Sequence, residues 1–403
     1  MKIIKKDGTV DGWNGEKIKE AVYKAAARVN QYVEPDVLNK LVEKVHSCLI
    51  IDRDVPTKDL HKEVIHYLKY FGLTDVANSY QEYRDYKNTY AKSFEKVKDE
   101  ADNVLLLGDR ENANFDSSLV STKGSLIKGY LTKELYRQFY LSKEEKELTK
   151  RGDIYIHDMR DMLMGSVNCC LFDIGNVLRG GFSMSNVDYT EPTSVLSALQ
   201  VIGDITLVAT AQQFGGFSLS QLDMVLLPYC HKTLEKAYEH AKHSFPDEGR
   251  SAWIAYSKDT LKNELKQGFQ SLELKLNTVP CSRGDFAFTT ISFGCWNAPQ
   301  WLGRYLTNKD LWILKEICEA ILTTRMNGHG ENHKPVVFPK LVYLYEENYL
   351  SAFQEARDVF ELAIECSSKC MYPDFLSLTG DWAHSSVGKQ YMENKQVVTP
   401  MGA

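Results

Sequence analysis

Apolar positions recur with helical spacing through most of the first ninety residues. Asp7-Gly8 is a hairpin turn signal, so residues 1–10 predict a short β-hairpin. Asn14 directly precedes the first apolar repeat and is expected to cap its helix, while Thr57 is expected to cap the third helix. The four expected helices span residues 15–29, 35–50, 57–72 and 74–88. These elements predict a small, mainly helical unit.

The middle of the chain changes its pattern several times. Residues 93–114 are charged and weakly periodic, which favours a linker. Residues 131–148 predict a helix, in which Ser142 and Glu145 have the spacing of a capping box. Two longer helical stretches are expected after it. The first begins as a turn and becomes a long apolar helix over 192–227, and the second is polar over 231–275.

Strand patterns are interleaved with these helices. Asp153 to Asp158 alternates polar and apolar residues, which predicts a strand with polar groups on one face. Aromatic and β-branched residues over 286–294 predict a second strand. A helix at 309–326 and a strand at 336–343 repeat the alternation, so an α/β fold is expected for this half.

Composition limits the classes of function. The chain has 403 residues, enough for two or three domains, and its net charge of −6 argues against a general nucleic-acid binder. The sequence contains no run of about eighteen apolar residues, so no membrane span is expected. Nine cysteines without a leading signal segment favour free thiols in a reducing compartment, so we expect a cytoplasmic protein.

A polar strand end, a thiol pair and a glycine turn come close together between residues 152 and 186. Asn168 precedes the adjacent thiols of Cys169 and Cys170, and Gly180-Gly181 follows. Buried cysteine is common, so plain packing is the more frequent outcome for such a pair. Successive side chains on a strand alternate faces, so at most one of the two thiols is expected to serve a site. Composition does not choose between them.

Basic residues gather at the predicted hairpin. Lys5 and Lys6 flank its turn, and Lys17 lies in the first turn of the following helix. Phosphate at that helix N-terminus would meet free N–H groups as well as the lysines, although a solvated basic turn is the simpler interpretation.

Metal binding is a minority interpretation for two other pairs. His329 and His333 are four residues apart in a glycine-rich loop without an acidic residue at the usual spacing. Cys366 and Cys370 are four apart on a predicted helix, and structural zinc needs four ligands. No metal ligand is therefore assigned.

The stretch around Asn168-Cys169 resembles the active-site segment of the anaerobic (class III) ribonucleotide reductases, which are glycyl-radical enzymes. Tyr155 departs from the family pattern, which often has His there. The matching positions are Gly152-Asp153-Ile154, His157-Asp158, Asn168-Cys169, Leu171, Asp173, Gly181-Phe182, Met184, Asn186, Gln213, Gly215-Gly216 and Leu227-Pro228-Tyr229. The resemblance implies reduction of ribonucleoside triphosphates to deoxyribonucleoside triphosphates by a thiyl and glycyl radical mechanism.

The same resemblance implies a fold and a set of roles. The fold is a ten-stranded α/β barrel of the glycyl-radical type, incomplete here, over residues 115–403, and region 192–227 contributes to a dimer contact and a specificity-effector site. Cys169 is the working cysteine, and His157, Asp158 and Asn168 bind substrate. Met401-Gly402 matches the tip of the catalytic loop, and Ala403 stands where the family has its radical cysteine.

Residues 1–92 resemble an ATP-cone, the regulatory module found ahead of many ribonucleotide reductases. Lys5-Lys6-Asp7-Gly8 matches its opening motif with Lys in place of Arg, which loses a bidentate fork. The resemblance implies that ATP permits activity and dATP inhibits it. The implied nucleotide-contacting residues are Lys5, Lys6, Asn14, Lys17, Thr57 and His61.

Several partners follow from the resemblance alone. Met401 favours formate as reductant, with a dithiol protein acting through Cys170 or Cys281 as the alternative. A radical-SAM activating enzyme and a homodimer or higher oligomer are expected, whereas nucleic acid and membrane are not. The glycyl-radical motif and a four-cysteine zinc cluster are absent from the sequence. We therefore expect a truncated chain, a split gene or an intein junction, inactive alone, with a C-terminal fragment chain as a possible partner. The alternative function is a non-catalytic nucleotide-sensing or assembly subunit.

Overall fold

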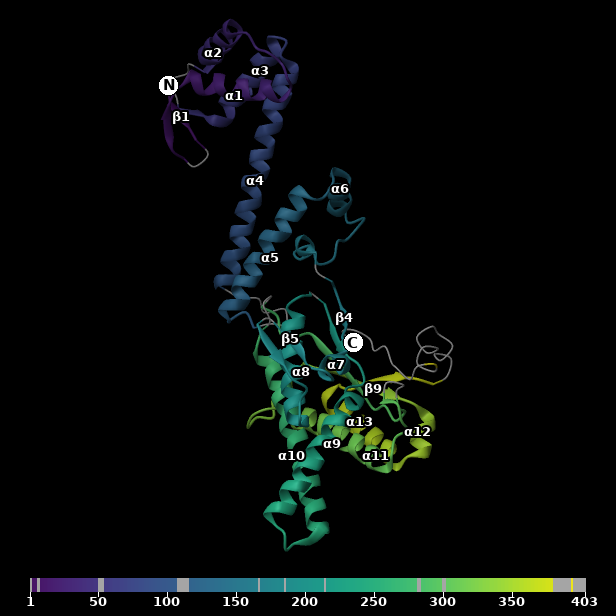
Figure 1. The fold of residues 1–403 in the computed structure, drawn as a ribbon. Coiled ribbons are helices and arrows are strands. Elements are labelled where there is room, and N and C mark those ends of the chain that lie inside the picture. The colour runs from purple at the N-terminus through teal and green to yellow at the C-terminus, as the bar shows by residue number, and fades with distance from the viewer. Residues whose placement is uncertain are drawn as a thin grey trace. The chain divides into compact units, whose positions relative to one another are not determined.

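The chain forms two units in the computed structural model, Met1–Asp99 and Glu100–Ala403 (Figure 1). The structure describes residues 2–5, 8–49, 54–106, 116–165, 167–184, 186–213, 215–280, 284–298, 302–379 and 393. Each unit has its own hydrophobic core. Within the described residues, no helix combines the length and the apolar character needed to cross a membrane.

The first unit contains a small sheet and a set of amphipathic helices. Strand β1 (Lys2–Ile4) pairs antiparallel with β2 (Val10–Gly12) and parallel with β3 (Val55–Pro56). The helices are α1 (Gly15–Arg28), α2 (Pro35–Leu49), α3 (Thr57–Tyr70) and α4 (Thr74–Leu106), of which the last seven residues belong to the second unit. Their apolar faces pack together around fully buried residues such as Val22, Leu38 and Val64. The predicted hairpin and all four predicted helices are therefore confirmed.

Two details of this unit differ from the sequence prediction. The residue that caps α3 is Pro56, and the Thr57 hydroxyl instead donates a hydrogen bond to the Ile4 carbonyl at 2.7 Å, which ties α3 to β1. Helix α4 does not end near residue 88 but continues to Leu106, through the first part of the stretch predicted as a linker. The boundaries 1–92, 93–114 and 115–403 remain predictions.

The second unit is built on a parallel sheet of five described strands in the order β10-β9-β8-β7-β4. Every neighbouring pair is parallel. The strands are β4 (Cys170–Leu171), β7 (Phe217–Leu219), β8 (Thr289–Phe293), β9 (Lys340–Tyr345) and β10 (Asp374–Ser377). The α/β class is thereby confirmed, and closure into a ten-stranded barrel remains a prediction.

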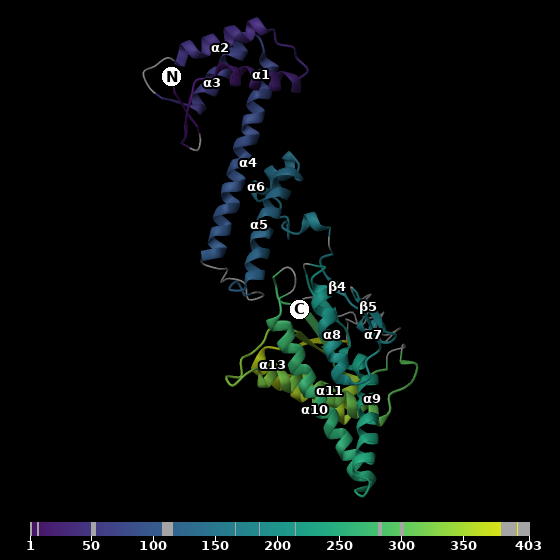
Figure 2. The ribbon, with the colours of Figure 1, turned by 60° about the vertical axis from the view of Figure 1, so that its left-hand side comes forward.

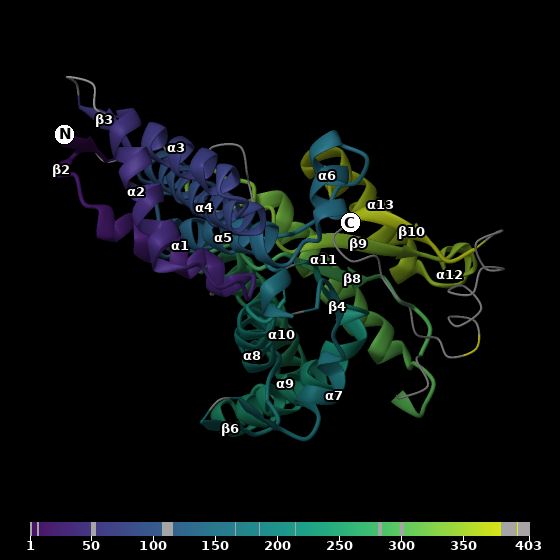
Figure 3. The ribbon, with the colours of Figure 1, turned by 90° about the horizontal axis from the view of Figure 1, so that it is seen from above.

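Long helices connect the strands, as parallel pairing requires. They are α8 (Val195–Thr210), α9 (Leu222–Ser244), α10 (Gly249–Thr278), α11 (Asn308–Asn327) and α13 (Gln354–Cys370), with the short α12 (Glu347–Ala352) before the last. Figures 2 and 3 show α8, α9 and α10 side by side, and α11 against α13. The expected strands near 286–294 and 336–343 and the helix at 309–326 are confirmed.

Helices α5 (Val120–Phe139) and α6 (Lys143–Arg151) replace the single helix predicted over 131–148. The predicted capping box is present and explains the break, because Ser142 and Glu145 begin a new helix instead of lying inside one. The predicted strand at 153–158 is wrong. Gly152 ends α6 in the left-handed conformation, and the chain then turns, with Asp158 at φ 48°.

The single helix predicted within 192–227 is also wrong, since the chain there forms α8, β7 and the start of α9. Before it, α7 (Ile174–Leu178) leads to a hairpin of β5 (Phe182–Met184) and β6 (Val187–Tyr189). The expected glycine turn is present, with Gly181 at φ 76° and packed so closely on Tyr189 that a Cβ atom would collide with its carbonyl.

Candidate functional site

Asn168 and Cys169 lie directly before β4, against the turn that precedes β7. The Gly215 N–H donates to the Asn168 carbonyl at 2.5 Å, and the Gly216 N–H donates to Cys169 Sγ at 3.3 Å. The Cys170 N–H donates in turn to the Gly216 carbonyl at 3.0 Å. A Cβ atom on Gly215 would lie 2.5 Å from Cys169 Sγ, so only glycine fits this close approach. Residues almost fifty positions apart in the sequence thus meet at one thiol.

The two adjacent thiols have different surroundings. Cys170 packs against the hydrophobic core, and burial raises the pKa of its thiol. Cys169 is half-buried and is the one whose sulfur receives a backbone N–H. This difference agrees with the alternation expected for neighbouring residues at a strand and favours Cys169 as the reactive member of the pair.

His157 and Asp158 form a separate pair on the surface. The His157 side chain is 73% exposed, and its Nδ1 lies 2.5 Å from Asp158 Oδ2. Among the described residues, no hydrogen bond joins this pair to Asn168 or Cys169. Of the four predicted site residues, Asn168 and Cys169 therefore lie together at the glycine turn, whereas His157 and Asp158 form a pair that is not bonded to them. Met401, Ala403 and Cys281 lie outside the described residues.

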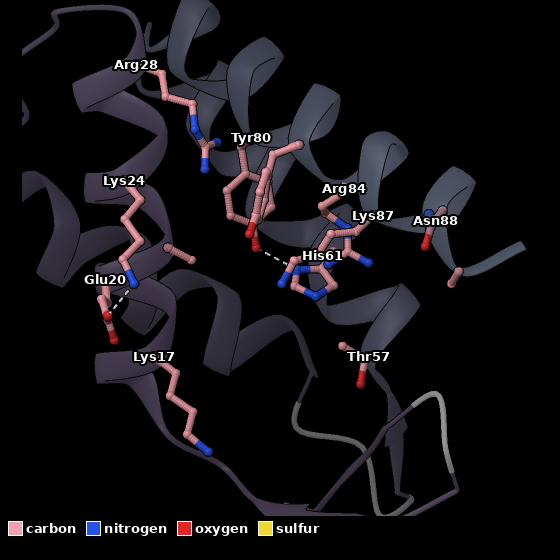
Figure 4. Close-up of a pocket in the computed structure, with 13 residues that line it drawn as sticks. Lys17, Glu20, Lys24, Arg28, Thr57, His61, Tyr80, Arg84, Lys87 and Asn88 are labelled. Atoms are coloured by element: carbon pink, nitrogen blue, oxygen red, sulfur yellow. Dashed lines mark hydrogen bonds and ion pairs between the residues drawn. The ribbon is translucent and has the colours of Figure 1, made fainter. Parts of the chain in front are cut away.

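The first unit contains a cavity of about 560 Å³ between α1, α3 and α4 (Figure 4). Its volume falls in the range of small-molecule sites. Five lysine or arginine side chains and one carboxylate line it, together with rings, hydroxyls and an amide. The lining residues are Lys17, Glu20, Ala21, Lys24, Arg28, Thr57, His61, Tyr80, Tyr83, Arg84, Lys87, Asn88 and Ala91.

Positive charge in the cavity is only partly neutralised. Lys24 pairs with Glu20 at 2.6 Å, and the Arg28 guanidinium lies over the Tyr83 ring at 4.1 Å. His61 Nδ1 lies 2.5 Å from the Tyr80 hydroxyl, and burial raises the pKa of that hydroxyl to about 12, so the phenol stays protonated. An excess of cations beside aromatic rings suits a ligand that carries phosphates and a planar base.

Three of the six residues predicted to contact a nucleotide line this cavity, namely Lys17, Thr57 and His61. Lys5 and Asn14 do not. Asn14 accepts the N–H groups of Glu16 and Lys17 and so caps α1, as predicted. Lys6 lies outside the described residues.

Lys5 and Lys17 share the carboxylate of Asp11 at 3.2 and 3.0 Å. Hydrogen bonds from these two lysines, Lys17 foremost, lower the pKa of Asp11 to about 2. Asp11 thereby holds the second strand of the hairpin next to the start of α1.

Sequence reasoning missed the contribution of α4 to this cavity. Tyr80, Tyr83, Arg84, Lys87 and Ala91 recur at three- and four-residue intervals, so one face of the helix lines the wall. That spacing was present in the sequence as a signal.

The two pairs considered for metal binding have other partners. His329 Nε2 lies 2.9 Å from Glu273 Oε2, whereas His333 Nδ1 lies 2.7 Å from the Asn327 carbonyl. Cys366 and Cys370 donate to backbone carbonyls of α11. Within the described ranges, no group of three or more metal-binding side chains is arranged to hold an ion.

Comparison with known proteins assigns both units. The family described as anaerobic ribonucleoside-triphosphate reductase matches residues 111–403, and the ATP cone domain matches residues 1–89. The anaerobic ribonucleoside-triphosphate reductase of Haemophilus influenzae is 30% identical over 393 residues, covering 93% of this chain and 52% of that protein. The Escherichia coli protein of the same name is 29% identical, covering 93% and 51%. The chain thus spans about half the length of the curated relatives it matches. A crystal structure of the Thermotoga maritima anaerobic ribonucleotide reductase with dATP and CTP covers 76% of this chain and 52% of that one, at 16% identity and a TM-score of 0.49.

Proposed function

The chain belongs to the family of anaerobic ribonucleoside-triphosphate reductases. From that premise we propose that it supplies the regulatory unit of such an enzyme and one of its reactive cysteines, Cys169. The reaction replaces the ribose 2′-hydroxyl of a ribonucleoside triphosphate by hydrogen and releases water. Formate is the proposed reductant and leaves as CO2. One observation carries the proposal for the catalytic part: the Gly216 N–H donates a hydrogen bond to Cys169 Sγ. The close contact of Gly215 with this sulfur leaves no room for a Cβ atom.

Cys169 is the group of this chain that exchanges a hydrogen atom or a proton with the substrate ribose. Cys169 is half-buried, and the exposed Asn168 beside it has an amide that can donate a hydrogen bond to a hydroxyl or accept one from it. His157 and Asp158 are proposed to reach the substrate only in the complete enzyme. Met401 and Ala403 are proposed to mark the catalytic loop, with Ala403 at the position of the radical cysteine. The glycyl radical and zinc of the family are expected outside this chain, and a radical-SAM enzyme generates the radical.

The cavity of the first unit is proposed to bind ATP and dATP as allosteric effectors. Lys17, Lys24, Arg28, Arg84 and Lys87 supply positive charge for a triphosphate, and Tyr80 and Tyr83 supply faces for adenine. Regulation further requires that the two nucleotides favour different arrangements of the assembly, because equal binding to both arrangements would shift nothing. A homodimer or higher oligomer in the cytoplasm is proposed.

Calorimetric titration of the 403-residue chain with ATP tests the proposal. Lys87→Ala removes a cation from the cavity wall, whereas Lys92→Ala removes one from the same helix outside it and serves as the control. Loss of one charge-assisted contact is expected to weaken ATP binding about tenfold in the first variant only. Equal affinities for the two variants, or no binding by the folded chain, would contradict the proposed effector site.

A further inference from the structure

Gln213 has a buried side chain between α8 and β7. It is 3% exposed, and its Nε2 donates to the Gly216 carbonyl at 2.8 Å and to the Gly215 carbonyl at 3.1 Å. Its backbone forms a parallel bridge with Val167, just before Asn168. The preceding residue, Gln212, is exposed, and it lines a surface cavity together with Gln213. Gln212 and Gln213 have the same side chain, but among the described residues only that of Gln213 donates hydrogen bonds to the carbonyls of Gly215 and Gly216.

The peptide group between Gly215 and Gly216 connects Gln213 to the thiol. Its carbonyl oxygen, on Gly215, accepts from Gln213, and its N–H, on Gly216, donates to Cys169 Sγ. A peptide group is planar, so fixing the direction of its carbonyl also fixes the direction of its N–H. Glycines on both sides of this peptide leave the plane free to rotate unless a side chain holds it.

We infer that Gln213 is a positioning residue, which holds the Gly215–Gly216 peptide so that its N–H points at Cys169 Sγ. A hydrogen bond donated to sulfur favours negative charge on the sulfur and turns the S–H of the neutral form away from the glycine turn. Gln213 thus sets both the reactivity and the direction of the working thiol without touching substrate. The inference rests on the proposed function in that it takes Cys169 as the reactive cysteine.

Alkylation by iodoacetamide as a function of pH tests the inference on the whole chain. Fragment-ion mass spectrometry separates Cys169 from Cys170 within one peptide. Gln213→Met keeps the length of the side chain and its burial but removes both donors, and Gln212→Met is the matched control. Loss of a hydrogen bond to a charged group is expected to raise the midpoint of the Cys169 rate profile by about one pH unit. Because a more basic thiolate is also more nucleophilic, the rate at pH 7 is expected to fall only about threefold.

A second variant covers the case in which Gln213→Met does not fold. Gln213→Leu removes both donors with a shorter apolar side chain, and circular dichroism reports the fold of each variant. A profile of either folded variant that coincides with that of Gln212→Met overturns the inference. Should Cys169 of the unaltered chain react no faster than Cys170 at pH 7, the assignment of Cys169 fails instead. The two failures are therefore distinguishable.

Discussion

The buried ion pair between Glu273 on α10 and Arg325 on α11 offers a sharp test of what stabilises the second unit. Arg325 Nε lies 2.9 Å from Glu273 Oε1, and their side chains are 1% and 5% exposed. Arg325 Nη2 also donates to the Pro339 carbonyl at 2.6 Å, before β9, and His329 binds the second oxygen of Glu273. The pair therefore joins two helices to the loop that leads into a central strand.

Removing one partner leaves the other as an uncompensated buried charge. We expect Glu273→Leu and Arg325→Met each to lower the free energy of unfolding by about 3–5 kcal/mol. The double variant removes both charges but leaves the Pro339 carbonyl and His329 without these partners, so its loss is expected to be about 1–3 kcal/mol, well below the sum of the single losses. Glu365 and Lys369 form an exposed pair on α13, and Glu365→Ala is expected to cost less than about 0.5 kcal/mol.

Urea unfolding followed by tryptophan fluorescence measures these changes. Trp13 lies in the first unit and the other tryptophans follow residue 100, so a Trp13→Phe background restricts the signal to the second unit. A double variant whose loss equals the sum of the single losses within about 0.5 kcal/mol would refute the coupling. A loss below about 1 kcal/mol for Glu273→Leu would show that Arg325 is not confined as the structure indicates.

Two further predictions concern a cap and a buried carboxyl. Asn14→Ala is expected to destabilise α1 by about 1 kcal/mol, whereas Asn14→Asp keeps the cap; hydrogen exchange of the α1 amides measures the difference, and equal protection in both variants would contradict it. Burial raises the pKa of Asp223 from 3.8 to about 6. The unfolded chain therefore loses this proton at lower pH than the folded chain does. As pH rises from about 4 to 6, the free energy of unfolding of the second unit is expected to fall by about 3 kcal/mol. Asp223→Asn is expected to flatten that fall in urea unfolding between pH 4 and 7, and parallel profiles would count against it.

Elements with several turns or repeats could be predicted from the sequence, because periodicity and caps act locally. Asn14 caps α1 and Ser142 forms its capping box because each needs only neighbouring N–H groups. Strand β8 was predictable from its β-branched and aromatic run. The two and three residues of β4 and β7 are too few to show a period, and they exist only because they pair with each other and with β8.

The candidate sites were likewise predictable where a local motif marks them and not where they depend on tertiary packing. The family resemblance included both Asn168-Cys169 and Gly215-Gly216, and the structure shows the hydrogen bonds that join the two segments. The alternation from Asp153 to Asp158 was misleading, since Gly152 ends a helix there and the chain turns. The cavity of the first unit depends on which helix faces meet, which is a tertiary property. Lys17 was therefore predictable from its place in a motif, while Arg84 was not recognised.

The hydrogen bonds at the two ends of the parallel sheet bear on where the proposed chemistry lies. Ligands of open α/β sheets usually bind beyond the carboxyl ends of the strands. Here that end is occupied by internal bonds, since Asp223 accepts the N–H groups of Gly294 and Cys295 just after β8, and the Gln221 N–H binds Ser292. Cys169 lies at the opposite end, one residue before β4, where Gly216 precedes β7. A thiol placed before a strand can use the N–H of a neighbouring turn that the sheet does not consume, as Cys169 uses that of Gly216, and this geometry supports the proposed role of Cys169 at the amino end of the sheet.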